Sequence, residues 1–307
     1  MPRPSFTFLT WNLCLLESSA EAPSNWRMDL TESKVREFIL ELQPDFVFFQ
    51  ELPALVPFVE NYDLIPSNTI SHSGTIATIA KEELMDDLES KSIGRFGVFT
   101  AVRSARLTFA NVHLEPGRDG DFKRLEMLRT ISRTCPTDAL AIIGDTNMRV
   151  AEEKSLEPLG LFGDRPPRPT WNTKLNKYRD KGRAFTSYFT RYFHSEYVEV
   201  DNIVVHDEPI EHEGDKFYLS DHFALSGRVT VLTKDEVKQK RAEAAKLAKS
   251  DSDPKKSSSA VRCTILLNHE IRETHENRKA PFRVFRVFRG YLLLGREPEP
   301  MSIVLLR

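Results

Sequence analysis

The sequence predicts an α+β layered sandwich that covers about residues 1–233. Segments with strand character outnumber helical segments, and neighbouring strands resembling hairpins alternate with helical crossovers. The composition supports a sizeable core, because 40% of the 307 residues are apolar and 20 are phenylalanine. One large domain of this class fits the length.

The individual elements follow from short apolar runs and helical spacing. Strands are predicted at residues 6–11, 45–50, 75–80, 97–103, 107–112, 139–143, 198–205 and 223–232. A helix is predicted over 31–42, where Val35, Phe38 and Ile39 recur at helical spacing and Pro44 follows. A second helix is predicted over 121–133, with Arg124 and Arg129 on its solvated face. Residues 161–192 are expected to be loop-rich.

The composition changes after residue 233. Residues 234–260 consist mainly of Lys, Ala, Ser and Asp, which favours a solvated helix running into a disordered linker. Its segment KQKR (238–241) resembles a weak nuclear-import patch, but a plain solvated linker is the favoured interpretation. Residues 261–307 regain apolar runs and form a C-terminal extension of unknown role.

Charge and cysteine content narrow the class of protein. Residues 234–307 hold 17 Lys and Arg against 10 Asp and Glu, a balance of +7, so the first 233 residues carry −9 of the net −2. A broad DNA-coating surface is therefore not expected, whereas a small phosphate pocket with a divalent cation fits. Three widely spaced cysteines give neither a disulfide framework nor a zinc pattern, and they favour an intracellular compartment. No segment with the length of a membrane span is visible, and a monomer is expected.

Polar side chains follow the apolar strands at one position after another. These are Asn12, Glu51, His113, Asp145 with Asn147, Asp201, and Asp221 with His222. Because strand ends at one edge of a layered fold converge, we expect these side chains to meet in a site.

The residue types suit phosphodiester hydrolysis. Glu51 can hold Mg²⁺, with Mn²⁺ as an alternative, and the cation would neutralise a phosphoryl oxygen. Asp145 can take a proton from water, while Asn12 and Asn147 orient the water and the phosphate oxygens. His222, paired with Asp201, would be held cationic beside the transferring phosphorus centre.

The ordered motifs TWN (10–12), QE (50–51), HLE (113–115), GDTN (144–147), DNI (201–203) and SDH (220–222) resemble the endonuclease/exonuclease/phosphatase superfamily. The narrower features are GDTN followed by Met148 and Arg149, HLE followed by Arg118, and TWNT (170–173). These resemble the type-two tyrosyl-DNA phosphodiesterases, which remove topoisomerase peptides from DNA 5′ ends.

The resemblance implies a DNase I-like, four-layered α/β sandwich in which two packed mixed sheets are flanked by helices. It implies hydrolysis of a 5′-phosphotyrosyl bond in DNA repair, on single-stranded DNA carrying a protein adduct, in the nucleus or cytoplasm. It assigns the metal to Glu51, assisted by Asp221, and catalysis to Asp145, Asn147, Asp201 and His222. Substrate binding falls to Asn12, His113, Glu115, Arg118, Arg149 and Trp171.

Two departures from the pattern leave alternatives open. Cys14 stands where the tyrosyl-DNA group usually has an acidic residue, and DNI replaces the more usual DRI. The alternatives are another enzyme of the superfamily, such as an abasic-site endonuclease, an exonuclease or a small-molecule phosphatase, and an inactive scaffold. Trp11 and Trp171 are by default half-buried core aromatics.

Overall fold

The computed structural model describes residues 2–14, 28–52, 57–66, 69–71, 74–176 and 185–251. The chain divides into a unit of Met1–Ser252 and a second unit of Asp253–Arg307. The predicted extension, residues 261–307, and the last part of the predicted linker lie outside the described residues. No described helix combines the length and the apolar character that crossing a membrane requires.

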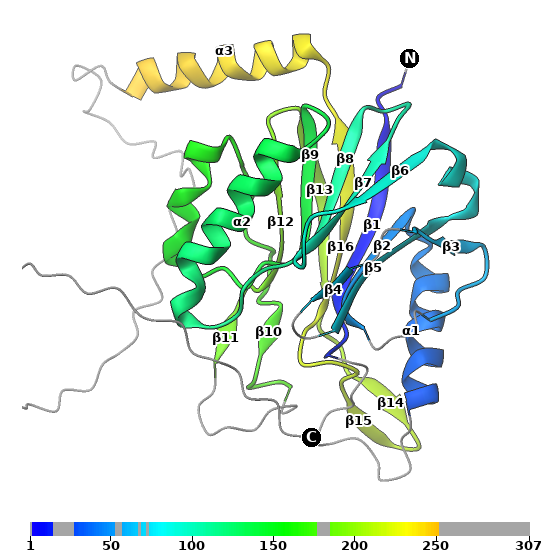
Figure 1. Ribbon diagram of the computed structural model, residues 1–307. Helices are drawn as coiled ribbons and strands as arrows, with labels where there is room; N and C mark the ends of the chain where they lie inside the picture. The colour runs from blue at the N-terminus through cyan, green and yellow to red at the C-terminus, as the bar shows by residue number, and fades with distance from the viewer. Residues whose placement is uncertain are drawn as a thin grey trace, which may run out of the picture. The chain divides into compact units, whose positions relative to one another are not determined.

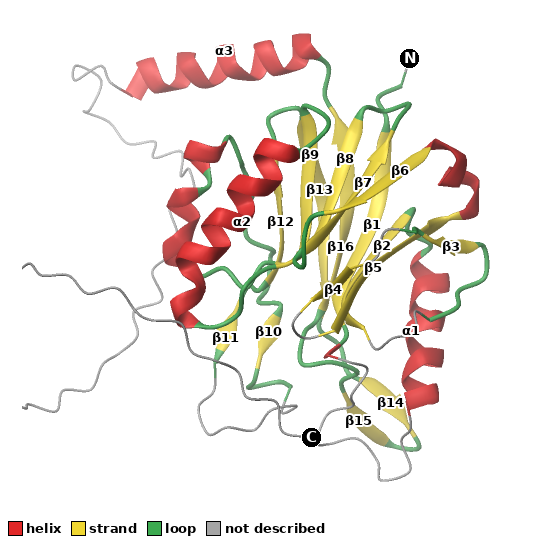
Figure 2. Cartoon of the chain, viewed as in Figure 1, coloured by secondary structure: helices red, strands yellow, loops and turns green. Residues whose placement is uncertain are grey.

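Two large mixed sheets form the body of the first unit (Figures 1 and 2). The first sheet has the order β13 (Val198–His206), β16 (Ala224–Val231), β1 (Ser5–Asn12), β2 (Phe46–Leu52), β5 (Gly74–Lys81), β3 (Tyr62–Leu64), with β4 (Thr69–Ser71) also paired to β5. The second has the order β12 (Thr190–His194), β9 (Ala139–Asp145), β8 (Leu107–His113), β7 (Gly97–Val102), β6 (Leu88–Ser92). Short pairs are formed by β10 (Trp171–Asn172) with β11 (Thr186–Ser187), and by β14 (Ile210–His212) with β15 (Asp215–Phe217).

Helices cover the outer faces of both sheets, which confirms the predicted four layers. Helix α1 (Met28–Leu42) packs Val35 and Ile39 onto the first sheet, and α2 (Asp121–Thr134) packs Leu128 and Ile131 onto the second (Figure 1). Short 3₁₀ helices lie at Glu82–Asp87, Arg118–Gly120, Val150–Ser155 and Glu157–Leu159. The apolar faces of the helices thus cover the outer faces of the sheets, so the central strands are buried on both faces.

Helix α3 (Lys234–Asp251) begins where the sequence predicted a solvated helix. It belongs to the first unit, and its Lys240 and Arg241 form ion pairs with Glu199 and Glu196. Three members of the KQKR segment are engaged in this way, since Lys238 also pairs with Asp235 on the same helix. These pairs are exposed to solvent, so they contribute little to the stability of the fold.

The side chains that face between the sheets turn from apolar to polar at one end of the sandwich. Alternate residues of β1, β2, β8 and β9 point into this interface, where Phe8, Phe46, Phe48 and Phe109 form the core. Continuing the same alternation along β1, β8 and β9 leads to Asn12, His113 and Asp145. Because β1 and β2 run parallel, as do β8 and β9, their carboxyl ends meet at this same end.

A buried polar layer separates that end from the phenylalanine core. Gln50 Nε2 donates to Asn111 Oδ1 at 2.8 Å across the two sheets. Asn111 Nδ2 in turn donates to the backbone oxygen of Ala77 at 2.8 Å and to Thr78 Oγ1 at 3.1 Å. These bonds satisfy amides that would be costly to bury alone, and they fix the sheets' mutual register beneath the strand ends.

Several elements differ from the sequence-based expectation. Helix α1 begins at Met28, three residues before the predicted start. Strand β12 begins inside the segment predicted to be loop-rich, which also contains β10 and β11, and β3, β4, β6, β14 and β15 were not predicted. On α2, Phe122 is exposed whereas Arg124 is buried, the reverse of what their hydropathy suggests. Pairing with β9 makes β12 a strand despite its local composition, and the ion pair with Glu152 buries Arg124 despite its charge.

Gly144 allows β8 and β9 to approach each other directly before Asp145. Its φ is +141°, and a Cβ at this position would lie 2.2 Å from the backbone oxygen of Val112. Gly144→Ala is therefore expected to destabilise the fold by at least about 2 kcal/mol, through strain and overlap with backbone. Urea unfolding measures this, with Gly160→Ala as a control for positive φ in open space. Equal midpoints for the two variants would contradict it.

Candidate active site

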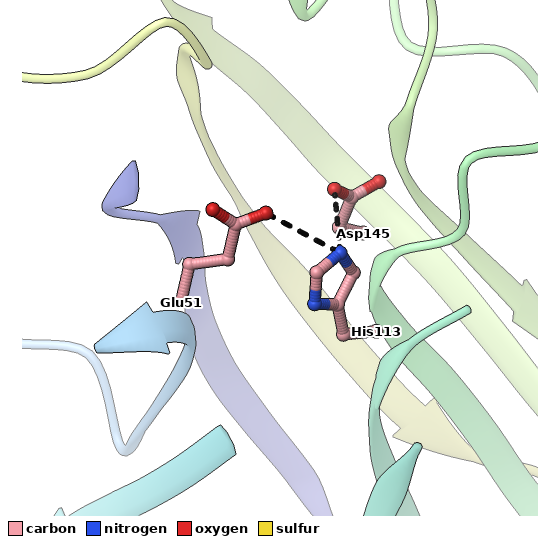
Figure 3. A group of neighbouring side chains, drawn as sticks. All are labelled: Glu51, His113 and Asp145. Atoms are coloured by element: carbon pink, nitrogen blue, oxygen red, sulfur yellow. Dashed lines mark ion pairs between the residues drawn. The ribbon is translucent and has the colours of Figure 1, made fainter. Parts of the chain in front are cut away.

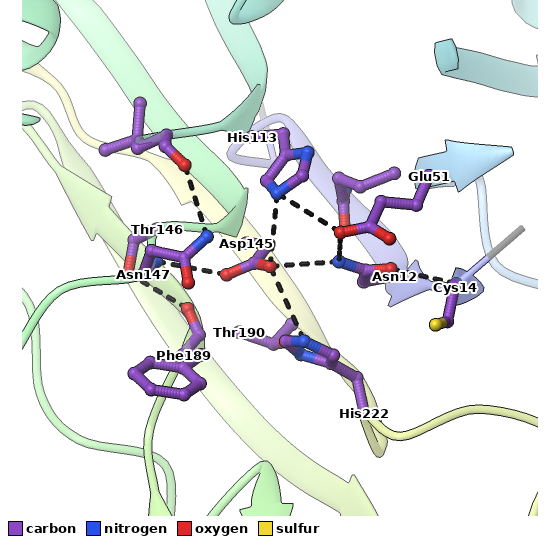
Figure 4. A network of polar contacts seen from close by, with 12 residues as sticks. Asn12, Cys14, Glu51, His113, Asp145, Thr146, Asn147, Phe189, Thr190 and His222 are labelled. Atoms are coloured by element: carbon purple, nitrogen blue, oxygen red, sulfur yellow. Dashed lines mark hydrogen bonds and ion pairs between the residues drawn. The ribbon is translucent and has the colours of Figure 1, made fainter. Parts of the chain in front are cut away.

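Four strand ends bring Asn12, Glu51, His113 and Asp145 together at the polar end of the inter-sheet interface (Figures 3 and 4). Asn12 Nδ2 donates to Glu51 Oε1 at 3.1 Å and to Asp145 Oδ2 at 2.9 Å. The two carboxylates therefore face one another across a single amide. Asn12 and Asp145, 133 positions apart in sequence, meet because β1 and β9 of the two packed sheets end at the same end of the sandwich.

Unusual backbone conformations surround this cluster. Cys14, Glu51 and Asn147 all have positive φ, at +46°, +52° and +50° respectively. The register of β2 against β5 shifts between Phe49 and Leu52, so Glu51 lies within a bulge that turns its side chain into the site. Non-glycine residues held in this region are strained, and such strain concentrates at functional sites.

Cys14, which stands at the usually acidic position, acts through its backbone. Its N–H donates to Asn12 Oδ1 at 2.9 Å. This bond determines which way the Asn12 amide faces, because it occupies the oxygen and leaves Nδ2 toward the carboxylates. The thiol itself is buried.

Asp145 is the most heavily contacted group of the site. Its side chain is 2% exposed. Oδ1 accepts the backbone N–H of Asn147 at 3.0 Å, while Oδ2 accepts from Asn12. His222 Nε2 lies 3.6 Å from the same Oδ2. An ionised carboxylate that accepts several hydrogen bonds is stabilised in a buried place.

The side chain of Asn147 points away from the Asp145 carboxylate. Its Nδ2 donates to the backbone oxygen of Leu114 at 3.1 Å, and so the GDTN and HLE segments are joined directly. The backbone of Asn147, rather than its amide, contacts Asp145.

Glu51, His113 and Asp145 could share a metal ion. His113 Nε2 lies 3.5 Å from Glu51 Oε1 and 3.5 Å from Asp145 Oδ2, and the three ligand atoms are within 4.8 Å of one another (Figure 3). Carboxylate oxygens are the donors that hard divalent cations prefer, so the site fits such an ion. Within the described residues the group that meets this spacing does not include Asp221, the second predicted metal residue, which is buried nearby.

His222 is held from the opposite side by a threonine. Its Nδ1 lies 3.1 Å from the hydroxyl of Thr190, the first residue of β12. The sequence-based expectation placed Asp201 in this position. In the structure Asp201 is half-exposed on β13, opposite Arg228 of β16, with an ion-pair distance of 3.6 Å.

The expectation that Asp201 contacts His222 is therefore wrong, because Asp201 faces Arg228 instead. Arg228 lies four residues beyond Ala224, the first residue of β16, which corresponds to roughly 13 Å along the strand at 3.3 Å per residue, and His222 precedes the strand. Asp201 pairs with Arg228, so it sits at a distant register position of the same sheet. The bulge between Asp201 and Val204 makes the motif DNI an irregular strand segment rather than a strand end.

Hydrogen bonds of Trp11 and Ser220 anchor the SDH loop to β1, and a further bond lies within the loop. The indole Nε1 of Trp11 donates to the backbone oxygen of His222 at 3.0 Å. Ser220 Oγ donates to the backbone oxygen of Asn12 at 2.6 Å and accepts the N–H of His222 at 3.1 Å. Trp11 is buried, as its default interpretation suggested, but it also fixes the loop that carries His222.

Aromatic rings and a guanidinium form one side of the site. Trp171 meets the His222 ring edge-on, with ring centroids 4.7 Å apart, and Phe189 lies 5.6 Å from Trp171. The Arg149 guanidinium lies 4.6 Å above the Phe189 ring. Burial, together with the charge of Arg124, lowers the pKa of Arg149. The Arg149 guanidinium and the Phe189 ring together suit a ligand that combines an anionic group with an aromatic or planar group.

Arg118 and Glu115, the other predicted substrate-binding residues, lie next to this side. Arg118 is exposed at the start of a 3₁₀ helix, and its charge contributes to lowering the pKa of Arg149. The carboxylate of Glu115 accepts a bond from Lys123 at 2.6 Å.

Arg124 is a structural residue of the site that the sequence did not reveal. Its fully buried guanidinium donates to the backbone oxygens of Glu115 and Gly117, at 2.7 and 2.9 Å. It also makes two bonds with the Glu152 carboxylate, at 2.7 and 2.8 Å. Glu152 in turn accepts the N–H of Arg149 at 3.2 Å. One buried cation thus joins the two loops that carry Arg118 and Arg149.

Comparison with solved structures agrees with this architecture. TDP2 of D. rerio, solved with a single-stranded DNA product, has a TM-score of 0.58 at 18% identity, over 73% of this chain and 98% of that one. TDP2 of C. elegans gives 0.56 at 17% identity, over 74% and 75%. An endonuclease/exonuclease/phosphatase family protein of Bacteroides thetaiotaomicron gives 0.57 at 13% identity, over 76% and 97%.

No family model and no curated protein matches the sequence. The likeness is therefore one of structure, in two packed mixed sheets flanked by helices. It confirms the resemblance that the strand-end motifs predicted and the fold that the resemblance implied. The chain has the DNase I-like fold of the endonuclease/exonuclease/phosphatase proteins.

Proposed function

We propose that this protein is a divalent-cation-dependent phosphodiester hydrolase. The observation that carries the proposal is the convergence of Asn12, Glu51, Asp145 and His222 on one point, with the two carboxylates bridged by a single amide. These groups are buried to different degrees, and Glu51 is the more open carboxylate, with a side chain 17% exposed. A small anionic group fits such a site better than a duplex would.

Each residue has a role that follows from its contacts. Asp145 accepts the proton of the attacking water at Oδ2, the oxygen that faces His113 and His222. His222 Nε2, next to that carboxylate, donates a hydrogen bond to a phosphoryl oxygen. Asn12 holds the two carboxylates in register, because its amide contacts both.

Glu51 would hold the cation, together with His113 and Asp145, whose ligand atoms lie within 4.8 Å of one another. A bound divalent ion neutralises charge on the phosphoryl group and stabilises the leaving oxygen. Mg²⁺ is the ion we propose, because both carboxylates offer hard oxygen donors, and Mn²⁺ is the alternative.

Glu51→Gln is expected to raise the cation concentration needed for half-maximal activity by at least about tenfold, because an amide oxygen is a weaker ligand than a carboxylate. The measurement is a titration of activity with Mg²⁺ and Mn²⁺. Glu60→Gln is the matched control, since Glu60 is exposed and outside the site. A curve for Glu51→Gln that overlies the wild type would exclude Glu51 as the ligand.

For the substrate, we propose a 5′-phosphotyrosyl bond between a protein adduct and a single-stranded DNA end, in DNA repair. Three features support it: the motifs GDTN and TWNT, the rim formed by Arg149 and Phe189, and the likeness to a TDP2 that was solved with single-stranded DNA product. A nuclear or cytoplasmic location follows from this proposal.

The test is cleavage of a single-stranded oligonucleotide bearing a 5′-phosphotyrosine, with and without Mg²⁺. The proposal predicts cation-dependent release of tyrosine and a 5′-phosphate end. An abasic duplex, which an abasic-site endonuclease would cut, and an unmodified single strand, which an exonuclease would degrade, serve as competing substrates. If the protein cleaves either of these in preference, the proposed phosphodiester hydrolysis stands and the proposed tyrosyl substrate is rejected.

A further inference from the structure

We infer that Thr190 is a positioning residue for His222, acting through its hydroxyl in the place where a carboxylate was expected. The inference rests on the proposed function only in that it takes His222 as the residue that contacts the phosphoryl group. The contact itself is a property of the fold: Thr190 Oγ1 lies 3.1 Å from His222 Nδ1 (Figure 4).

The position of the Thr190 hydroxyl determines how the His222 ring is oriented. Nδ1 and Nε2 lie on opposite sides of an imidazole, so fixing Nδ1 on Thr190 directs Nε2 to Asp145 Oδ2, 3.6 Å away. Thr190 and Asp145 are also paired residues of the neighbouring strands β12 and β9. The strand pairing therefore sets the distance between the hydroxyl and the carboxylate, and the imidazole lies against both.

Thr190 is itself held rigidly. It is fully buried, and its N–H donates to Thr170 Oγ1 at 3.0 Å. The backbone oxygen of Thr170 accepts the N–H of Phe223, the residue after His222, at 2.9 Å. Two buried threonines thus join the segment before Trp171, the start of β12 and the SDH loop. A clamp of this kind restricts the rotamer of His222 at both its ring and its backbone.

A hydroxyl differs from a carboxylate in what it can support. It donates or accepts, so it can bond to either tautomer of the ring, and it carries no charge. Orientation is therefore the contribution of Thr190, and a misplaced catalytic group lowers the rate of the chemical step more than it weakens binding. The expected signature is a loss in kcat with KM nearly unchanged.

The experiment compares Thr190→Val with Thr190→Ser in the full chain. Valine keeps the shape but removes the hydroxyl, and we expect kcat to fall about 10- to 100-fold while KM changes less than about threefold. Serine keeps the hydroxyl and should restore kcat to within about threefold of the wild type. Thr108→Val is the matched control, because it removes another buried hydroxyl bond, 2.8 Å to Thr137, on β8.

A second readout does not depend on turnover. The ¹⁵N chemical shifts of the His222 ring report its tautomer and hydrogen bonding, and they should change in Thr190→Val but not in Thr190→Ser or Thr108→Val. If the wild type hydrolyses no phosphodiester but these shifts change as expected, the proposed function fails and the positioning role stands. Unchanged shifts in Thr190→Val, or a kcat equal to that of Thr108→Val, would overturn the inference.

Discussion

Asp145→Asn is expected to lower kcat by at least about 10³-fold, because the substitution removes the group that takes the proton from water. The side chain keeps its size, and the backbone N–H of Asn147 keeps an oxygen to bond at Oδ1. Folding stability should therefore change far less than activity. The measurement is kcat for hydrolysis of a phosphodiester at saturating divalent cation, alongside the thermal midpoint.

Asp201→Asn provides the matched control for this prediction. The motif pattern assigns Asp201 a supporting role at His222, whereas the structure pairs it with Arg228 on the half-exposed face of β13. We expect its kcat to stay within about twofold of the wild type, as for other surface substitutions away from a site. A large loss in Asp201→Asn, with little loss in Asp145→Asn, would reverse the assignment.

Arg124→Met is expected to destabilise the fold by about 3–5 kcal/mol, since it leaves the Glu152 carboxylate without its buried partner. Methionine preserves much of the side-chain length, so the loss reports on the guanidinium. The backbone oxygens of Glu115 and Gly117 also lose their donor. Urea unfolding gives the free energy, provided that the transition is two-state.

Arg129→Met is the control on the same helix. Arg129 bonds only one turn away, to Glu126, and about a third of its side chain is exposed. Its substitution should change stability by less than about 0.5 kcal/mol. If both variants lose the same small amount, the network around Arg124 is not a determinant of stability.

The contrast between these two arginines shows where the sequence was informative. Helical spacing places both on α2, and hydropathy assigns both to solvent, as the sequence-based prediction did. The burial of Arg124 depends on Glu152, 28 residues further on, and on two backbone oxygens of the preceding loop. Such partners are set by tertiary structure, and no local pattern announces them.

The strand ends were predictable for a physical reason. A continuous apolar run marks a strand that is buried on both faces, and a polar residue at its end must lie at the edge of the layers. Asn12, Glu51, His113 and Asp145 follow such runs and do meet. Asp201 lies within the run VEVDNIVV rather than after it, and there the rule gave the wrong neighbour.

Thr190 could not be found in the same way. It begins a five-residue strand, TRYFH, in a region whose prolines and glycine favour loops. This strand forms because its residues pair with β9, and Arg191 is buried there against Glu153. A buried arginine beside a polar threonine gives no strand signal in sequence, although the pairing of Thr190 with Asp145 places its hydroxyl beside His222.

The most direct test of the account is hydrolysis of an aryl ester of thymidine 5′-phosphate by the purified full-length chain, with Mg²⁺, with Mn²⁺ and with a chelator. It tests the phosphodiester chemistry without assuming a protein adduct. The account predicts release of the phenol with a divalent cation, none above background with the chelator, and a loss of at least about 10³-fold in Asp145→Asn. No release with either cation, or equal release in the presence of the chelator, would contradict it.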